Sequence, residues 1–415
     1  MAANLTTVAD LLKLDYLPPI REQLENKNLL FSRWRRDNES VVGKQIVVPL
    51  HYGRNEGIGA RPDGGTLPSA GRQTYKQMAF NVAYNYGRIK ITGPLIASAR
   101  SNEGAFARAL TSEVSGMVTD LERDLEIQRF GAGTGVRAVC GTTNASATVV
   151  IGSGIWNLRV GMSVDIRAMA DNVAIANGLA TGITTVTPGT SAADQAVGAG
   201  TIVVDGGVVT TTSSHGVYRA GSVSATGPAY YEEMGLSGIV SATDPTASGL
   251  QGLAVASYPW WKATVLGNGG TARHLTLTML DQLLDKVDQT GNGKISAFVM
   301  RHGIRRKIQA LVSVNQRYMD TVKVKAGAEV PSYNNVPIFV SNLCPGRKIF
   351  AIDDTNHLSI YRMTGFEWMD KDGEMLHRVS GEDAYEAVLT VYETPGTDHR
   401  AAHALLDDLK ENEET

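Results

Sequence analysis

The feature that most constrains this chain is a long amphipathic segment at residues 101–130. Its apolar side chains recur at intervals of three or four residues, the repeat of one face of an α-helix. They are Phe106, Leu110, Val114, Met117, Leu121 and Leu125. Ser101 or Asn102 can cap the start, and Gly131 can end the helix. A helix of about 28 residues is a rod of about 42 Å. Such a helix is long for the core of a compact domain, and its length suits a helix that spans a flat subunit.

The stretch before this helix, residues 43–92, is predicted to form a long two-stranded hairpin that extends away from the rest of the chain. Gln45–Leu50 reads as one strand, and Met78–Ile91 as the other, with aromatic and branched residues at alternate positions. About 25 residues rich in glycine and arginine lie between them. Two strands bury too little surface to be stable alone. We therefore expect this hairpin to lie on another surface, and a neighbouring copy is the natural one.

Charge is distributed unevenly along the chain, although the formal net charge is only −3. Residues 1–100 contain 14 Lys and Arg against 8 Asp and Glu, which gives +6, whereas residues 366–415 contain 4 against 14, which gives −10. Opposite patches on one subunit favour head-to-tail contacts that repeat around a ring or shell. Charge scatter without a partner is the alternative interpretation.

Residues 141–228 differ in composition from the rest of the chain. Only 7 of these 88 residues are charged, and Thr, Val, Gly, Ser and Ala dominate. Short β-like runs such as Thr148–Ile151, Ser163–Arg167 and Thr201–Val204 are separated by turns that contain glycine. The pattern predicts a small inserted β domain, a barrel or a sandwich. A flexible surface loop is the alternative, which the valine and isoleucine content disfavours.

Residues 229–395 have mixed α/β character. Helices are predicted at Leu275–Gln289 and Gly303–Val314. Strands are predicted at Ile295–Met300, Val336–Ser341, Lys348–Ile352, Leu358–Arg362 and Ala384–Tyr392. Residues 396–415 are interpreted as a charged tail of weak helical character.

Near the N-terminus, Arg33, Trp34, Arg35 and Arg36 form a basic quartet. It either faces packaged nucleic acid through phosphate contacts, or is a turn in which Trp34 packs against a neighbour. Packing is the favoured interpretation.

The sequence contains no recognisable catalytic, cofactor or metal motif. The glycines at 131–135 follow a helix rather than a strand, and Gly291–Lys294 lacks the other residues of a phosphate-binding loop. His399 and His403 are four residues apart and could share a helix face, but no Glu or Cys accompanies them, so a solvated tail is expected there. The pairs Asp353-Asp354 and Glu232-Glu233 are interpreted as surface charge. We therefore predict that the protein is not an enzyme and needs no cofactor or metal.

The sequence features that bear on localisation favour a protein made in the cytoplasm. The start of the chain lacks a basic leader followed by an apolar core, and no window is apolar enough to cross a membrane. The two cysteines, Cys140 and Cys344, are expected to be free thiols of a reducing cytoplasm.

The order of these parts resembles the major capsid proteins of tailed bacteriophages, which have the Hong Kong 97-type shell fold. The strand and basic helix within Lys294–Leu311, and the segment Tyr333–Ser341, are also similar to segments common in that family. The resemblance implies an α+β fold with an N-terminal arm, an extended β-hairpin loop, a long spine helix, peripheral and axial domains, and an inserted small β domain.

The resemblance also assigns the segments. They are the arm (1–42), the extended loop (43–92), the spine helix with the start of the peripheral domain (93–140), the inserted barrel-like domain (141–228), the axial domain (229–365), the C-terminal peripheral strands (366–395) and an acidic tail (396–415). The spine helix itself is expected at about 102–131.

The family implies self-assembly into pentamers and hexamers that form an icosahedral head around double-stranded DNA, built in the host cytoplasm. The extended loop of one subunit would lie over its neighbour. The candidate contacts are the loop cations Arg54, Arg61, Arg72 and Lys76, and the spine-helix acids Glu113, Asp120 and Glu122. Arg33, Trp34, Arg35 and Arg36 are candidates for the arm at the inner face. A separate scaffolding protein is implied, with a portal, packaged DNA held non-specifically and an optional decoration protein as further partners.

Two other functions stay open on the sequence. One is the shell of an encapsulin-like nanocompartment, which shares the fold and encloses enzymes. The other, suggested by the island at 141–228, is a secreted β-rich carbohydrate-binding protein, against which the missing signal peptide argues.

Overall fold

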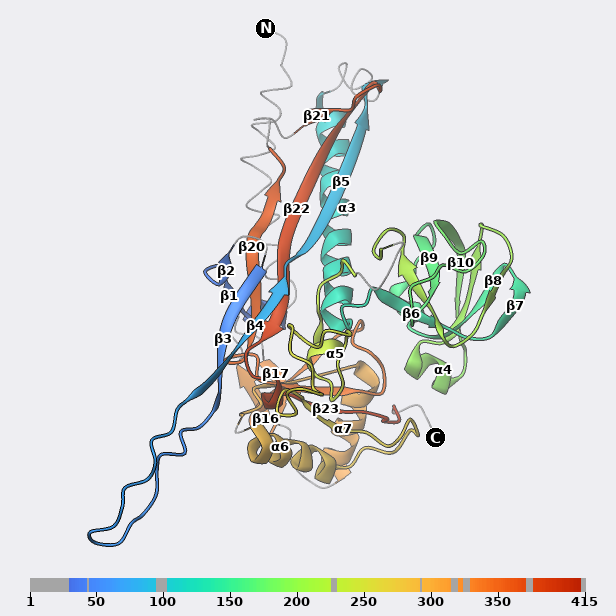
Figure 1. Cartoon of the computed structure of the whole chain (residues 1–415). Coiled ribbons are helices and arrows are strands. Elements are labelled where there is room, and N and C mark those ends of the chain that lie inside the picture. The colour runs from blue at the N-terminus through green and yellow to red at the C-terminus, as the bar shows by residue number, and fades with distance from the viewer. Residues whose placement is uncertain are drawn as a thin grey trace.

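A computed structural model gives the fold. It describes residues 30–42, 45–94, 103–224, 230–291, 293–314, 320–323, 329–370 and 376–411. Residues 1–29, most of the predicted arm, lie outside the described residues. Three units make up the described chain, with a hairpin that projects from them (Figure 1).

The first unit is a long helix packed on a five-stranded sheet. The helix is α3 (Glu103–Phe130), which confirms the predicted spine helix, and the backbone N–H of Gly131 ends it by donating to the carbonyls of Ile127 and Gln128. The strands are β5 (Ala83–Thr92), β22 (Ala384–Thr397), β20 (Leu358–Trp368), β1 (Arg35–Asp37) and β21 (His377–Arg378). Strand β22 pairs with β5 along one edge and with β20 and β21 along the other.

The contact between α3 and this sheet is apolar. Val114, Val118, Leu121 and Leu125 are buried against side chains of the three longest strands. Those side chains are Ile89, Ile91, Phe366, Trp368, Ala387, Leu389 and Val391. Each fully buried aliphatic side chain contributes about 1.5–3 kcal/mol. The predicted stripe omitted Val118, and the side chains of Phe106 and Leu110 lie outside the description.

The predicted strand Met78–Ile91 was wrong as a single element. The structure divides it at Val82 into β4 (Thr74–Asn81) and β5, and Val82 itself is buried. Strand β4 pairs with β3 (Gln45–Gly53) in the hairpin, with β2 (Val41–Val42) beside them, whereas β5 joins the sheet under α3. In the sequence, aromatic and branched residues stand at alternate positions on both sides of Val82. The sequence pattern therefore could not reveal that the strand is interrupted there.

The second unit is a closed barrel, which confirms the predicted inserted β domain. Its six strands, in spatial order, are β10 (Thr181–Pro188), β11 (Gly200–Val204), β8 (Thr148–Ser153), β6 (Val136–Cys140), β13 (His215–Arg219) and β9 (Ser163–Ala168). A small sheet of β7 (Thr143–Ser146) and β12 (Val209–Thr211), the turn η2 (Ile155–Asn157) and helix α4 (Ala192–Val197) complete it. Valine and isoleucine side chains fill the interior. The first strand begins before residue 141, where the composition changes.

The third unit is a seven-stranded mixed sheet with helices. In order the strands are β14 (Thr264–Leu266), β23 (Ala404–Leu406), β19 (Ile349–Ile352), β15 (Ala297–Met300), β18 (Val336–Val340), β17 (Glu329–Tyr333) and β16 (Asp320–Lys323). The helices are α5 (Leu236–Ile239), α6 (Leu277–Gly291) and α7 (His302–Val314). The helices α6 and α7 predicted from the sequence agree with the observed ones within two residues at each end. No described helix is both long and apolar enough to cross a bilayer.

The predicted charged tail at 396–415 was wrong. Strand β22 runs to Thr397, a short turn η3 (Arg400–Ala402) follows, and β23 then lies inside the seven-stranded sheet between β14 and β19. Arg400 is fully buried and donates to the main-chain carbonyls of Gly238, Ile239, Thr243 and Trp261. The acidic residues that flank this segment concealed its short apolar core.

His403 is buried as well, which corrects the expectation of a solvated histidine. Its Nδ1 accepts from the backbone N–H of Asp353 at 3.2 Å, and its Nε2 lies 3.0 Å from the Thr397 hydroxyl. These contacts suit the neutral ring with the proton on Nε2. Burial lowers the pKa of His403 to about 4.

Replacing Leu125 with alanine should lower the free energy of unfolding by about 2–5 kcal/mol, because a cavity would open between α3 and the sheet. Urea unfolding of the unassembled chain measures this. Arg123→Ala, at an exposed position of the same helix, should change the value by no more than about 0.5 kcal/mol. Equal effects of the two substitutions would contradict the packing described here.

Acid should destabilise the chain through His403. The unfolded histidine titrates near its ordinary pKa of 6.5 and the folded one near 4, so the unfolded state binds more protons between these values. The contribution is complete above pH 6.5 and is lost as the pH falls toward 4, on the order of 3 kcal/mol in all. Denaturant unfolding across this range measures the loss, and His403→Gln should remove the corresponding part of the pH dependence. An unchanged pH profile in that variant would rule the assignment out.

Candidate assembly surfaces

The hairpin is anchored at its base and exposed at its tip. Ile46 and Met78 are fully buried, and the N–H of Ala79 donates to the carbonyl of Gln251 at 3.2 Å. Tyr52 stacks on Trp260 with ring centroids 4.9 Å apart. Beyond the last pair of the stem, Gly53 with Thr74, the chain projects away from the body (Figure 1). The stem is thus fixed, and the tip is presented to solvent.

Of the predicted loop cations, three lie on the tip and one on the stem. Arg54, Arg61 and Arg72 are exposed. Arg61 donates to the carbonyls of Ala60 and Thr66 and holds the tip together. Lys76 instead lies over the ring of Tyr258, 5.3 Å from its centroid, and a hydrogen bond to Tyr258 raises the pKa of Lys76.

The tip also carries two exposed apolar side chains that the sequence analysis did not single out. Ile58 and Leu67 are each 82% exposed. A tight turn joins the two sides of the tip, with the N–H of Gly65 donating to the carbonyl of Pro62, and Gly64 at a φ of +70°. Apolar residues beside glycines in a basic loop were the available signal for a contact surface.

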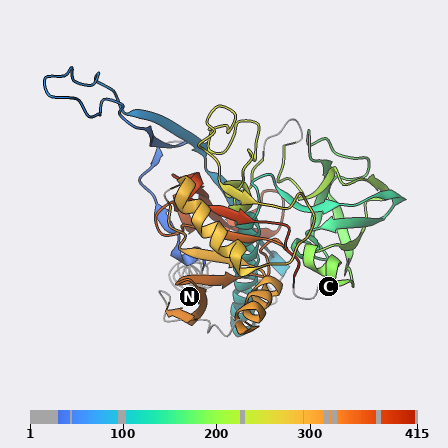
Figure 2. The same ribbon diagram turned by 90° about the horizontal axis from the view of Figure 1, so that it is seen from below.

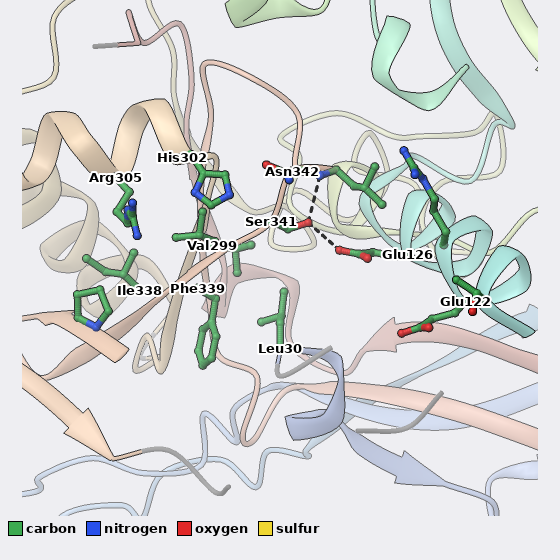
Figure 3. A pocket seen from close by; sticks show the side chains of 15 residues that line it. Leu30, Glu122, Glu126, Val299, His302, Arg305, Ile338, Phe339, Ser341 and Asn342 are labelled. Atoms are coloured by element: carbon green, nitrogen blue, oxygen red, sulfur yellow. Dashed lines mark hydrogen bonds between the residues drawn. The ribbon is translucent and has the colours of Figure 1, made fainter. Parts of the chain in front are cut away.

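The predicted spine acids do not form one surface. Glu113 and Asp120 are exposed, and Asp120 accepts from Arg159 of the barrel at 2.6 Å. Glu122 is half-buried and lines a different cavity, of about 720 Å³, between α3 and the third unit. Figure 3 shows Glu122 beside Glu126, which accepts from the Ser341 hydroxyl at 2.6 Å. Only Glu113 and Asp120 therefore face the same side as the barrel.

Ion pairs fix the barrel to the spine helix, and the side chain of Arg137 in them is buried. Arg137 of β6 donates to Glu232 at 2.6 Å and to Asp124 of α3 at 3.1 Å, and Arg219 of β13 donates to Asp124 at 2.6 Å. Burial opposes ionisation of Asp124, but Arg137 and Arg219 outweigh it and lower the pKa of this carboxyl. Burial raises the pKa of Glu232 in spite of Arg137.

A second buried cluster lies at the end of the spine helix. Arg129 of α3 pairs with Glu393 of β22, lies 3.5 Å from Glu233, and Glu393 accepts from Arg362 of β20 at 2.7 Å. Burial raises the pKa of Glu233, which also accepts from Asn85 at 3.0 Å.

Both acidic pairs that the sequence analysis placed on the surface are in fact buried. Glu232 and Glu233 belong to the two clusters just described. Asp354 is buried against Arg33 and Ser296, and Asp353 accepts from Thr355 and Asn356. The local sequence around two adjacent acids does not indicate that they are buried, because the cations that pair with them come from distant segments.

The predicted arm quartet is divided between core and surface. Arg33 forms a two-bonded pair with Asp354, at 2.8 and 3.0 Å, and lies over the ring of Phe339. Trp34 is buried in the core of its own chain. Arg35 and Arg36 belong to the outer strand β1 and are exposed. Of the four side chains, Arg35 and Arg36 are thus the exposed ones.

The described residues hold no cluster of three or more His, Cys, Asp or Glu side chains that fits a metal ion. Both cysteines are buried, and burial raises the pKa of the Cys140 thiol to about 12 and that of the Cys344 thiol further. These thiols are therefore poor nucleophiles.

The hairpin and the barrel project from opposite sides of the body. Figure 2, seen from below, agrees with Figure 1 on this placement. Opposite projections cannot meet within one copy. They can meet between successive copies in a head-to-tail arrangement.

Replacing Arg137 with alanine would leave Glu232 without this cation and remove one of the two arginine partners of Asp124, so we expect a loss of about 3–5 kcal/mol in the free energy of unfolding. Arg159→Ala, which removes the exposed pair with Asp120, should cost less than about 1 kcal/mol. Urea unfolding and the rate of protease cleavage between barrel and spine measure both. A small effect of Arg137→Ala would show that the buried pairs do not hold the barrel.

Comparisons with known proteins give the fold. No protein-family model matches the sequence, and no curated protein matches it. Among solved structures, a chain of the cyanophage A-1(L) capsid asymmetric unit is 15% identical, with a TM-score of 0.50 and 92% of each chain covered. Two others are the capsid of the Myoviridae phage XM1 (9% identity, TM-score 0.44, 92% of each chain) and the holo-SrpI encapsulin complex of Synechococcus elongatus PCC 7942 (10%, 0.42, 99% of this chain and 97% of that one). The first likeness confirms the predicted fold class, the Hong Kong 97-type shell fold.

Proposed function

We propose that this chain is the major capsid protein of a tailed bacteriophage, which self-assembles into pentamers and hexamers of an icosahedral head around double-stranded DNA. The observation that carries the proposal is the projecting hairpin. Its stem is anchored in the body, whereas its basic and apolar tip has no surface to lie on within the described part of its own chain. A shell fold with such a projection fits a subunit completed by its neighbours.

Many weak contacts would hold the shell. Each exposed ion pair is worth well under about 1 kcal/mol, and burial of Ile58 and Leu67 would add about 1.5–3 kcal/mol for each side chain. We propose Arg54, Arg61 and Arg72 as the loop cations in this contact, with Glu113 and Asp120 as acids of the neighbouring copy. Lys76 and Glu122, the other candidates, have positions that suit a supporting role within the subunit.

Several partners belong to the same proposal. A separate scaffolding protein, a portal at one vertex and an optional decoration protein would complete the head, which would be assembled in the host cytoplasm. Arg35 and Arg36, exposed on the edge strand β1, are proposed to face the DNA and to contact it without sequence preference. No catalytic step is assigned to the chain.

Electron microscopy of the expressed chain, with and without a scaffolding protein, tests the proposal. We expect capsomers or closed shells, and particles from the native source should contain double-stranded DNA. Shells that contain enzymes instead would support the encapsulin-like alternative. A chain that stays monomeric under every condition would overturn the shell function and return attention to a β-rich binding protein.

Replacing residues 57–71 of the tip by a short Gly-Ser turn should abolish closed shells and leave the subunit folded, because the hydrogen bond described between this segment and the rest of its chain is local, from the Gly57 N–H to Asn55. Circular dichroism checks the fold, and electron microscopy with size-exclusion chromatography checks assembly. Val208→Ser, at an exposed position of the barrel, is the matched control and should assemble as the wild type does. Normal shells from the shortened chain would contradict the proposed role of the hairpin.

A further inference from the structure

One outer face of the barrel, on strands β10, β11 and β8, is neutral. These three strands contain no charged residue. Their buried residues, such as Val149 and Ile202, belong to the barrel core, and the residues between them are exposed or half-buried. The outward side chains are all threonine or valine and form two rows across the strands: Thr187, Thr201 and Val150 in one, and Thr185, Val203 and Thr148 in the other. We call these six residues the threonine–valine face.

This face lies on the side of the barrel away from the body. In the closed order β10, β11, β8, β6, β13 and β9, strands β10 and β11 stand opposite β6 and β13. Strands β6 and β13 supply Arg137 and Arg219, which pair with Asp124 of the spine helix. Docking of the barrel on its own subunit therefore leaves the threonine–valine face directed outward, as Figure 1 shows for β10 and β8.

The face is rigid as well as neutral. A threonine or valine side chain has few χ1 rotamers, so covering it costs little conformational entropy. The strands beneath it are paired on both sides within the closed barrel. Asp205, the first charged residue after β11, accepts from the Gly182 N–H at 2.6 Å and so is bound to its own barrel. Exposed protein surfaces are usually rich in charge, whereas the cores of interfaces are depleted in it.

We infer that the threonine–valine face is a contact between two copies, in which the barrels of neighbouring subunits meet face to face across a two-fold axis. A neutral face can meet its own image without like-charge repulsion, because a two-fold contact pairs the same surface on both subunits. A charged partner would lose its hydration here and find no opposite charge in exchange. The inference rests on the proposed shell function and adds a contact that does not involve the hairpin.

The size of the face decides how this contact can act. Neighbouring strands lie about 4.8 Å apart and alternate residues about 6.6 Å apart, so the two rows span roughly 10 Å by 7 Å. A stable protein pair buries about 800 Å² on each partner, which is far more than this face provides. The contact is therefore too small to hold two free subunits together. It stabilises copies that other contacts already hold in a shell.

Thiol cross-linking tests whether two copies meet at this face. Thr201 is central in its row, so Thr201→Cys chains treated with a short bismaleimide should give a cross-linked dimer in shells and none as free subunits. The native thiols are buried and should not react. Val160→Cys is the control and should give no dimer, because Val160 is exposed beside Arg159, which pairs with the spine helix. Shells of Thr201→Cys without a dimer would overturn the inference and leave the shell function intact.

Charge exchange tests whether the partner is the same face of a second copy. Thr201→Glu and Thr201→Lys each bring like charges together, so shells of either variant should come apart at a lower urea concentration than wild-type shells. Shells assembled from equal amounts of both variants should recover part of this loss, since opposite charges then meet. Val160→Glu and Val160→Lys should change nothing, and circular dichroism of the free chains checks that all variants fold.

The outcomes separate the contact from the function beneath it. A loss of shell stability in both variants without recovery in the mixture would show that a different protein covers the face, and would overturn the inference. Unchanged stability in both variants would also overturn it. Wild-type chains that form no shells would instead refute the proposed shell function.

Discussion

The buried charge cluster at the end of the spine helix is the constraint on which the other parts depend. Arg129 of α3 meets Glu233 of the segment returning from the barrel and Glu393 of β22, and Arg362 of β20 completes the set. Removing one partner from such a cluster is costly, because the remaining charge stays buried. The cluster therefore fixes the helix, the sheet and the barrel connection at one point, and the apolar face of α3 aligns the rest of the rod.

Because the body is rigid at this point, the hairpin and the barrel project from it in fixed directions. A hairpin or barrel on a loosely joined body would lose conformational freedom on each contact. Here Tyr52 stacks on Trp260 at the far end of the hairpin stem, and Arg137 holds the barrel against Asp124. Most of the ordering is thus complete before two copies meet. In the proposed shell, contacts of modest strength at the tip would then be sufficient, and they could break and form again during growth.

Helices and strands whose apolar residues recur at a regular spacing could be predicted from the sequence. The distant segments that pack against them could not. The helix at 103–130 and the barrel strands follow local patterns of apolar residues. The break at Val82 and the inclusion of Ala404–Leu406 in a central strand depend on which distant strands pair, and no local pattern encodes that. The acids at 232, 233 and 354 were misread for the same reason, since their cations lie far away along the chain.

The candidate contact surfaces could likewise be predicted only in part from the sequence. The glycine-rich basic tip was visible in the sequence as a contact element, because its composition alone makes it exposed. The acids proposed as its partners, Glu113 and Asp120, were also named from the sequence, but their separation from Glu122 was not, since Glu122 lines a different cavity of the folded chain. The barrel, which carries little charge, is joined to the spine helix through Arg137, Arg159 and Arg219, all of which pair with acids of that helix. Of the seven charged residues in 141–228, Arg159 and Arg219 pair with the spine helix, and Arg167 pairs with Asp165 inside the barrel.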